Sequence, residues 1–132
     1  MVKPVLPLIA CFALVSPMLA AAGENRGEMT EAGDAERGAL IYDSRCIGCH
    51  SLAANRIGPR HDDVFGREIG ALDDFDYSEA LRTAVGTWDR VSLDRWLADP
   101  EAYLPGQRMN VMVAQPQDRA DLIAFLRREA ER

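Results

Sequence analysis

Cys46-Ile47-Gly48-Cys49-His50 is the stretch that decides how this sequence folds. Two thiols three residues apart, followed at once by an imidazole, match C-x-x-C-H, the attachment signature of a c-type haem. The spacing has a physical reason, because thiols at i and i+3 reach the two vinyl groups of one porphyrin while the adjacent histidine lies beneath the iron. The motif predicts one covalent haem c, attached through Cys46 and Cys49, with His50 as the proximal ligand.

Two other uses of a C-x-x-C pair fit the sequence less well. A thioredoxin-like redox disulfide needs strands that alternate with helices around the motif, and the sequence has no such pattern. A structural zinc site needs further ligands, but His61 is the only other histidine. It gives two cysteines and two histidines at spacings unlike the usual zinc arrangements. Haem attachment is therefore the leading interpretation.

Length, composition and charge set the class of protein. A chain of 132 residues and 14.6 kDa has room for one domain of ordinary size. Hydrophobic residues make up 48% and charged residues 27%, which is typical of a globular protein and not of a disordered one. The formal charge of −6 and the pI near 4.9 argue against a nucleic-acid partner, because binding phosphates needs clustered positive charge.

The N-terminal stretch predicts export. Lys3 gives a positive start, residues 5–22 carry no charge, and Ala20-Ala21-Ala22 offers small residues to a peptidase. We expect residues 1–22 to be a cleaved signal peptide and the mature protein to be periplasmic. Cleavage removes the only lysine, which moves the formal charge from −6 to −7, and it leaves the two cysteines of the motif as the only ones.

Two alternatives to simple secretion stay open. The uncharged run approaches the ~20 residues that a membrane-spanning helix needs, so the segment, if retained, would anchor the protein. Pro7, Ser16 and Pro17 weaken that interpretation. Leu8-Ile9-Ala10-Cys11 loosely resembles a lipoprotein acceptor site, but little hydrophobic sequence precedes it.

The rest of the chain predicts an all-α domain. Residues 23–33 are polar and indicate a flexible leader, and residues 34–132 form the domain. Helical periodicity and capping residues predict about four helices, at 34–45, 78–85, 92–99 and from about 116 onward, with Asp34, Ser78 and Ser92 as N-caps. Long irregular loops join them. Such loops are hard to justify in a compact domain unless they wrap something large and apolar, which the haem supplies.

A six-coordinate iron needs a second axial ligand, and methionine beside histidine is the pairing that raises the reduction potential in cytochromes c. The candidates are Met29, Met109 and Met112. Met29 lies in the polar leader, whereas Met109 follows a Pro-Gly turn that can present its sulfur to the haem, so Met109 is favoured and Met112 competes. His61 is a weaker candidate, because its position just after the motif predicts a place on the proximal side.

The sequence resembles the small monohaem class I cytochromes c, the mitochondrial cytochrome c type and its soluble bacterial relatives. The similarity runs from about Gly38 to the C-terminus. Beyond the attachment motif it rests on Gly58-Pro59, Phe65-Gly66-Arg67, Phe75-Asp76-Tyr77-Ser78, Trp88, Leu93 to Leu97, Pro100, Tyr103, Pro105-Gly106-Gln107-Arg108-Met109 and Arg119-Ala120-Asp121-Leu122-Ile123-Ala124-Phe125-Leu126.

This resemblance implies a cytochrome c fold, in which the first and last helices cross, with Gly38 allowing their close approach and Tyr42, Leu122 and Phe125 packing there. It also implies roles around the haem. The carbonyl of Pro59 receives the proton on His50 Nδ1, and a haem propionate is held by Arg67, Tyr77 and Trp88.

The sequence departs from the family pattern at several positions. Leu81, Trp96 and Gln107 stand where the family often has asparagine, tyrosine and threonine near the methionine ligand, so we expect a less polar distal side and a raised potential. His61 stands where an apolar residue is expected. Val111 stands near the place of the usual aromatic cover, and the lysine-rich docking face of mitochondrial members is replaced at most by Arg45, Arg56 and Arg108.

The sequence predicts a monomeric periplasmic electron carrier whose haem cycles between ferrous and ferric states, with His50 and Met109 as axial ligands. It exchanges electrons with redox partner proteins and performs no separate enzymatic reaction, because no catalytic triad, phosphate loop or paired-carboxylate site is present. Two alternatives stay open. One is a haem c subunit of a larger oxidoreductase complex, and the other is a ligand-binding or redox-sensing haem protein with a labile sixth site.

Overall fold

A computed structural model of the chain describes residues 33–132. The expected signal peptide at 1–22, with the alternative lipidation site Cys11, lies outside the described residues. So does nearly all of the expected leader at 23–33, with Met29. The fold described below is that of the predicted domain.

The domain is all-α, as the sequence predicts. The described residues contain no β-strand, only an isolated bridge between Glu68 and Thr87. One helix more than expected is present among them. The helices are α1 (Ala35–Arg45), α2 (Glu79–Arg82), α3 (Arg90–Ala98), α4 (Pro100–Tyr103) and α5 (Pro116–Ala130).

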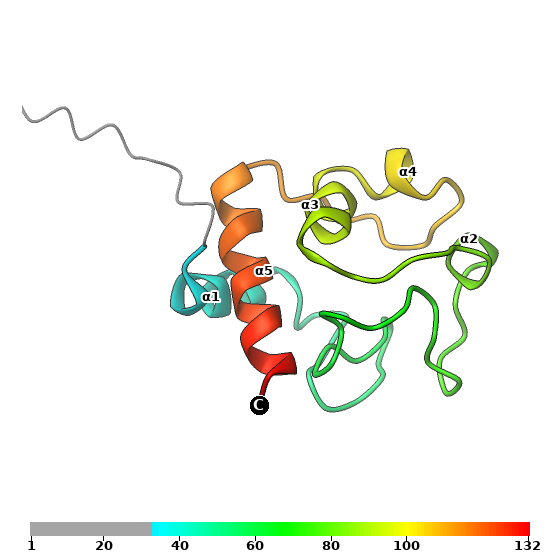
Figure 1. Ribbon diagram of the computed structural model, residues 1–132, viewed down its shortest axis with the longest axis horizontal. Coiled ribbons are helices and arrows are strands. Elements are labelled where there is room, and N and C mark those ends of the chain that lie inside the picture. The colour runs from blue at the N-terminus through cyan, green and yellow to red at the C-terminus, as the bar shows by residue number, and fades with distance from the viewer. Residues whose placement is uncertain (1–32) are drawn as a thin grey trace, which may run out of the picture.

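The first and last helices lie against each other, although they are far apart in the sequence (Figure 1). The Asp34 side chain caps α1 by accepting hydrogen bonds from the backbone N–H groups of Glu36 and Arg37, and Pro116 occupies the first turn of α5. Gly38 makes the contact close, because a Cβ atom there would lie 2.0 Å from the carbonyl oxygen of Asp121. The predicted crossing of the terminal helices is confirmed.

A buried carboxylate joins the two helices. Asp121 on α5 is fully buried, and it accepts hydrogen bonds from the backbone N–H of Asp34 at 2.7 Å and from the Gln117 side chain at 2.9 Å. It also pairs with the guanidinium of Arg37 on α1. The carboxylate therefore has three donors as partners, as a buried anion requires.

Three details of the helices differ from the sequence prediction. The cap of α3 is Asp89 and not Ser92, which lies in the first turn and completes a capping box by accepting from the Asp89 N–H at 2.8 Å. Helix α2 is capped by Ser78 as expected but ends at Arg82, three residues early. Helix α4 was not predicted; Asp99 caps it, and Pro100 begins it.

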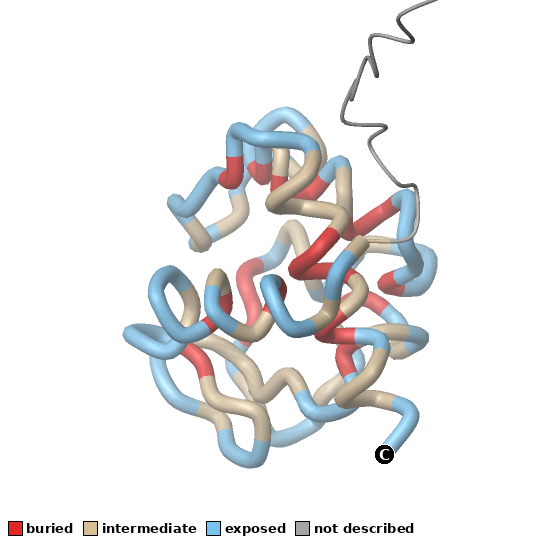
Figure 2. The backbone as a smooth tube through the Cα atoms, turned by 90° about the vertical axis from the view of Figure 1, so that its left-hand side faces the viewer, coloured by how far each residue is buried: buried red, intermediate tan, exposed pale blue. Residues whose placement is uncertain are grey.

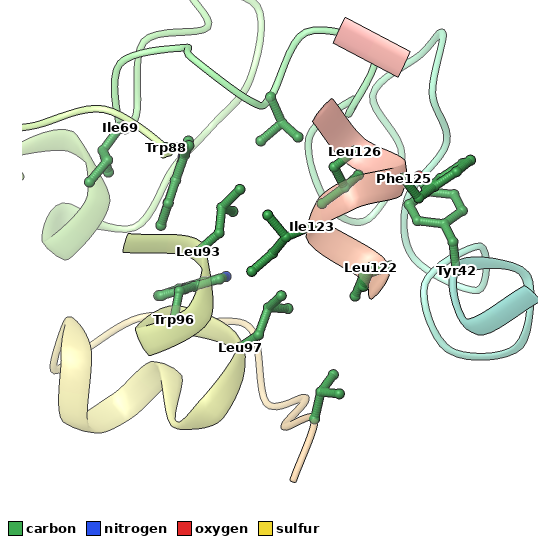
Figure 3. Packing of buried hydrophobic residues seen from close by; sticks show 12 residues of the cluster. Tyr42, Ile69, Trp88, Leu93, Trp96, Leu97, Leu122, Ile123, Phe125 and Leu126 are labelled. Carbon is green, nitrogen blue, oxygen red and sulfur yellow. The ribbon is translucent and has the colours of Figure 1, made fainter. Parts of the chain in front are cut away.

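The core lies between α5, α3 and the loops. In Figure 3, Leu93 and Leu97 of α3 point toward Ile123 and Leu122 of α5, while Tyr42 of α1 faces Phe125. Figure 2 shows the buried segments running through the middle of the molecule and the exposed ones around its rim. The buried cluster consists of Tyr42, Val64, Ile69, Trp88, Leu93, Trp96, Leu97, Val113, Leu122, Ile123, Phe125 and Leu126.

None of the helices in the described part of the chain has the length and apolar character that crossing a lipid bilayer requires.

Candidate haem-binding site

A cavity of about 240 Å³ opens beside the attachment motif. Helices α1, α2, α3 and α5 all contribute to its wall, together with the loops that follow α1 and precede α5. Apolar and aromatic side chains make up most of this wall, and Cys46, Cys49 and His50 line it. The long loops thus surround an apolar space, which is what a porphyrin requires.

His50 is held in the protonation state that binds a metal. The residue is only 8% exposed, and its Nδ1 lies 2.8 Å from the carbonyl oxygen of Pro59. A carbonyl only accepts, so Nδ1 carries the proton and the lone pair of Nε2 stays available. Burial lowers the pKa of His50, and the hydrogen bond to Pro59 opposes that shift only in part. The imidazole is therefore neutral at pH 7, as a ligand must be.

Gly58 makes room for the His50 ring. A Cβ atom at this position would lie 2.1 Å from Cε1 of His50 and 2.6 Å from each ring nitrogen, so no other residue fits without movement. The backbone holds the two segments together, because the N–H of Gly58 donates to the Cys49 carbonyl at 2.8 Å. Arg56, on the same segment as Gly58, adds a second bond to the motif, because its guanidinium donates to the Ile47 carbonyl at 2.5 Å.

Both thiols of the motif are free. Cys49 is exposed and Cys46 half-buried, and both lie at the cavity wall. Burial raises the pKa of the Cys46 thiol to about 11, against an opposing effect of Arg45. Covalent haem needs two free thiols for attachment, a neutral imidazole with a free Nε2 for the iron, and an apolar cavity for the porphyrin. The site has all three, so its residues fit the group that the motif implies.

Of the two methionine candidates among the described residues, Met109 lines the cavity and packs against the buried cluster. Met112 is 55% exposed and does not line the cavity. The loop that carries both is fixed at its far end by Arg119, whose guanidinium donates to the carbonyls of Val113 and Ala114 at 3.0 Å and to Asp94 at 2.7 Å.

The three residues expected at a propionate also lie along the cavity. Tyr77 and Trp88 are buried, and burial raises the pKa of the Tyr77 hydroxyl, so it stays protonated. The Arg67 side chain is 9% exposed; it pairs with Asp63 and donates to the Arg60 carbonyl at 3.1 Å. Its Nε is buried without an acceptor. A buried donor without an acceptor is where a carboxylate of the ligand fits.

Of the three residues that depart from the family pattern near the methionine, two lie at the cavity and one lies outside it. Leu81 and Trp96 line the cavity, so its wall is apolar there. Gln107 does not line it; its amide donates to Glu101 at 3.2 Å instead. Around the mouth, Arg45 and Arg108 line the cavity, with Arg108 bonded to the Asp76 carbonyl at 3.2 Å.

Sequence reasoning did not find how closely His61 and His50 meet. Their rings stack with centroids 4.0 Å apart and planes 21° from parallel. Burial, with His50 and Arg67 acting in the same direction, lowers the pKa of His61 well below its ordinary value. The sequence signal was a histidine at a position where an apolar residue is expected, but only the fold gives it a partner.

Comparison with known proteins agrees with this geometry. The cytochrome c family model matches residues 35–129. Cytochrome c of Cochliobolus lunatus is 37% identical over 105 residues, which cover 76% of this chain and 97% of the relative. Cytochrome c2 of Rhodomicrobium vannielii is 39% identical over 99 residues, covering 72% of this chain and 78% of the relative.

Among solved structures, cytochrome cH from Methylobacterium extorquens matches with a TM-score of 0.69 and 35% identity, covering 73% of this chain and 99% of the other. Cytochromes c are electron carriers with one covalent haem c that act with redox partner proteins, and Cys46 and Cys49 have the spacing that this attachment requires. The family match covers α1 to α4, all but the last residue of α5 and the cavity between them, and the chain therefore belongs to the cytochrome c family.

Proposed function

We propose that this protein is an exported, periplasmic electron carrier whose haem is attached through Cys46 and Cys49 and ligated by His50 and Met109. The observation that carries the proposal is the apolar cavity lined by all four of these residues. When bound, the haem iron supplies a one-electron couple between the ferrous and ferric states. The protein keeps both ligands in place and excludes water from most of the cofactor.

His50 and its neighbours orient the proximal side. The Pro59 carbonyl holds the proton on Nδ1, which fixes the tautomer and makes Nε2 the ligand atom. Gly58 lets the backbone pass close to the ring, and the Gly58–Cys49 hydrogen bond ties that backbone to the motif. The ligand is thereby oriented before an electron arrives.

The distal ligand is Met109 in this proposal and Met112 is its competitor. Met109 is supported by its place in the cavity wall and by the anchored loop that carries it, and Met112 is disfavoured by its exposure. A soft thioether stabilises the ferrous state and raises the potential, as an electron carrier of this type requires.

Arg67, Tyr77 and Trp88 are proposed to hold a propionate. Arg67 offers its free Nε and a positive charge, while Tyr77 and Trp88 are buried side chains with polar hydrogens at the same wall. A carboxylate buried in an apolar cavity needs such donors. Removing its countercharge would destabilise the buried anion.

A pair of variants tests the ligand assignment. Met109→Ala should open the sixth site, so that the ferrous protein binds carbon monoxide at neutral pH and the midpoint potential falls. Met112→Ala is the matched control and should behave like the wild type, with no carbon monoxide binding. The reverse result would make Met112 the ligand, and carbon monoxide binding by the wild type would favour the sensing alternative.

Intact mass tests attachment and export together. The proposal expects residues 23–132 plus one haem, and a reduced-minus-oxidised spectrum in alkaline pyridine that indicates two thioether links. A mass that starts at Met1 would indicate a retained anchor, and added acyl chains would indicate lipidation at Cys11. Either would contradict simple secretion, and stable co-purification with an oxidoreductase would favour the subunit alternative.

A further inference from the structure

We infer that His61 is a positioning residue for His50, and that its stacked ring fixes the orientation of the proximal imidazole about the bond to iron. The inference rests on the proposed function, in which His50 is the proximal ligand. It concerns a side chain of this protein that stands where an apolar residue is expected.

The contacts of His50 show what His61 adds. The Pro59 carbonyl, 2.8 Å from Nδ1, fixes the tautomer and the place of one ring atom, and the Gly58 backbone passes beside the ring. The His61 ring lies nearly parallel to that of His50 at 4.0 Å between centroids. A flat neighbour at this distance resists rotation of the imidazole, because rotation would drive the two rings into each other.

His61 is itself held in place by its backbone. Its N–H donates to the Ser51 carbonyl at 3.0 Å, and the N–H of Asp62 donates to the Leu52 carbonyl at 3.0 Å. These bonds tie the His61 segment to the residues directly after His50. The backbone on either side of the stacked pair is thus joined by hydrogen bonds, which keeps the two segments adjacent.

Helix α1 supports the other side of His61. Tyr42 meets His61 edge-on at 5.8 Å between ring centroids, and Tyr42 packs against Phe125 of α5 at 5.1 Å. His61 is thus enclosed between the crossing of the terminal helices and His50.

Ligand orientation has its own spectroscopic signature. In a low-spin ferric haem, the plane of the axial imidazole sets which iron d orbital shares the unpaired electron with the porphyrin. That orbital fixes the spread and order of the haem-methyl proton shifts and the anisotropy of the EPR signal. The orientation of the imidazole can therefore be measured separately from the stability of the protein.

The test compares variants of the full haem-loaded protein in the ferric state. His61→Leu and His61→Gln remove the flat ring, one without and one with polarity, whereas His61→Phe keeps a ring. We expect His61→Leu and His61→Gln to change the order or spread of the haem-methyl shifts and to broaden the EPR signal. We expect His61→Phe to restore the wild-type pattern, and Tyr42→Phe, which removes only a hydroxyl, to leave it unchanged.

Wild-type spectra from either His61→Leu or His61→Gln would overturn the inference, so the failure of one variant to accumulate leaves the other to decide. A phenylalanine variant that behaves like leucine would overturn it as well. A wild-type protein without attached haem or without a low-spin ferric spectrum would instead overturn the proposed function, and this inference with it.

Discussion

Gly58 is the residue at which the smallest change should have a large effect. A methyl group there would lie 2.1 Å from His50 Cε1, so either the ring or the backbone must move. We predict that Gly58→Ala lowers the free energy of unfolding by about 1–3 kcal/mol, the usual cost of overpacking, as measured by denaturant unfolding of the haem-loaded protein.

Gly48, inside the attachment motif, provides the matched control. A Cβ atom at Gly48 would meet nothing within 4 Å, so Gly48→Ala should unfold close to the wild type. Equal midpoints for the two alanine variants would contradict the steric role of Gly58.

Leu81 and Trp96 make the cavity wall apolar, which should disfavour the extra positive charge of the ferric state. We predict that Leu81→Asn lowers the midpoint potential by tens of millivolts, where a tenfold change in the one-electron equilibrium is about 59 mV. Trp96→Tyr should shift it in the same direction. Potentiometric titration measures both, and Leu40→Asn, on an exposed residue outside the cavity, should cause no shift. An unchanged or raised potential would refute this explanation.

Single residues differ in how well the sequence predicts them. The motif names Cys46, Cys49 and His50 because covalent chemistry fixes their spacing. The stack between His50 and His61 depends on where the loop at 51–60 returns, and no local pattern encodes that return. Its one sequence signal is a histidine at an apolar position.

At the scale of helices, the crossing of α1 and α5 depends on one buried carboxylate. Asp121→Ala removes the acceptor of three donors, from Asp34, Gln117 and Arg37. We predict a loss of about 2–3 kcal/mol in the free energy of unfolding. The Arg37 side chain is half-exposed and can be solvated, which keeps the loss at the lower end for a buried pair.

Asp118, one turn earlier on α5, is the control for that measurement. It lies in the first turn, where its negative charge interacts favourably with the helix dipole. Asp118→Ala should therefore lower the free energy of unfolding by about 0.3–1 kcal/mol. A loss at Asp121 no larger than the loss at Asp118 would show that the carboxylate does not join the helices.

The two terminal helices follow from the sequence. An apolar period and the Asp34 cap predict α1, and an apolar period, Pro116 and the charges at the two ends predict α5. The short helices follow from it only in part. Asp89 and Ser92 can both cap a helix, and only the capping box in the folded chain decides between them. Helix α4 has four residues, too few for a period, so the sequence predicts a helix that ends at 99 but not the next helix, which Pro100 begins.

At the scale of the whole molecule, the haem fills the centre of the fold. Without it, the apolar side chains that line the cavity would face water, and a domain of this size has little stability to spare for that loss of burial. We predict that the Cys46→Ser, Cys49→Ser double variant, which cannot attach haem, loses most of its helical circular-dichroism signal at 222 nm.

The wild type with attached haem is the reference for that measurement. A double variant without haem but with full helical signal and a cooperative thermal transition would show that the polypeptide folds alone. The loops at 46–78 show no helical or strand periodicity in the sequence, because their conformation depends on the cofactor that they surround. The sequence therefore predicts that something fills the centre, but not how the loops enclose it.

The two tryptophans of this chain, Trp88 and Trp96, both lie in the cavity wall with ring centroids 5.4 Å apart. Porphyrin absorbs the near-ultraviolet light that indole emits, so energy transfer should extinguish the fluorescence of both while the wall is closed. Tryptophan emission then rises only when unfolding moves these two side chains away from the haem. Tryptophan emission is thus an intrinsic probe of unfolding in this protein, which needs no dye and no label.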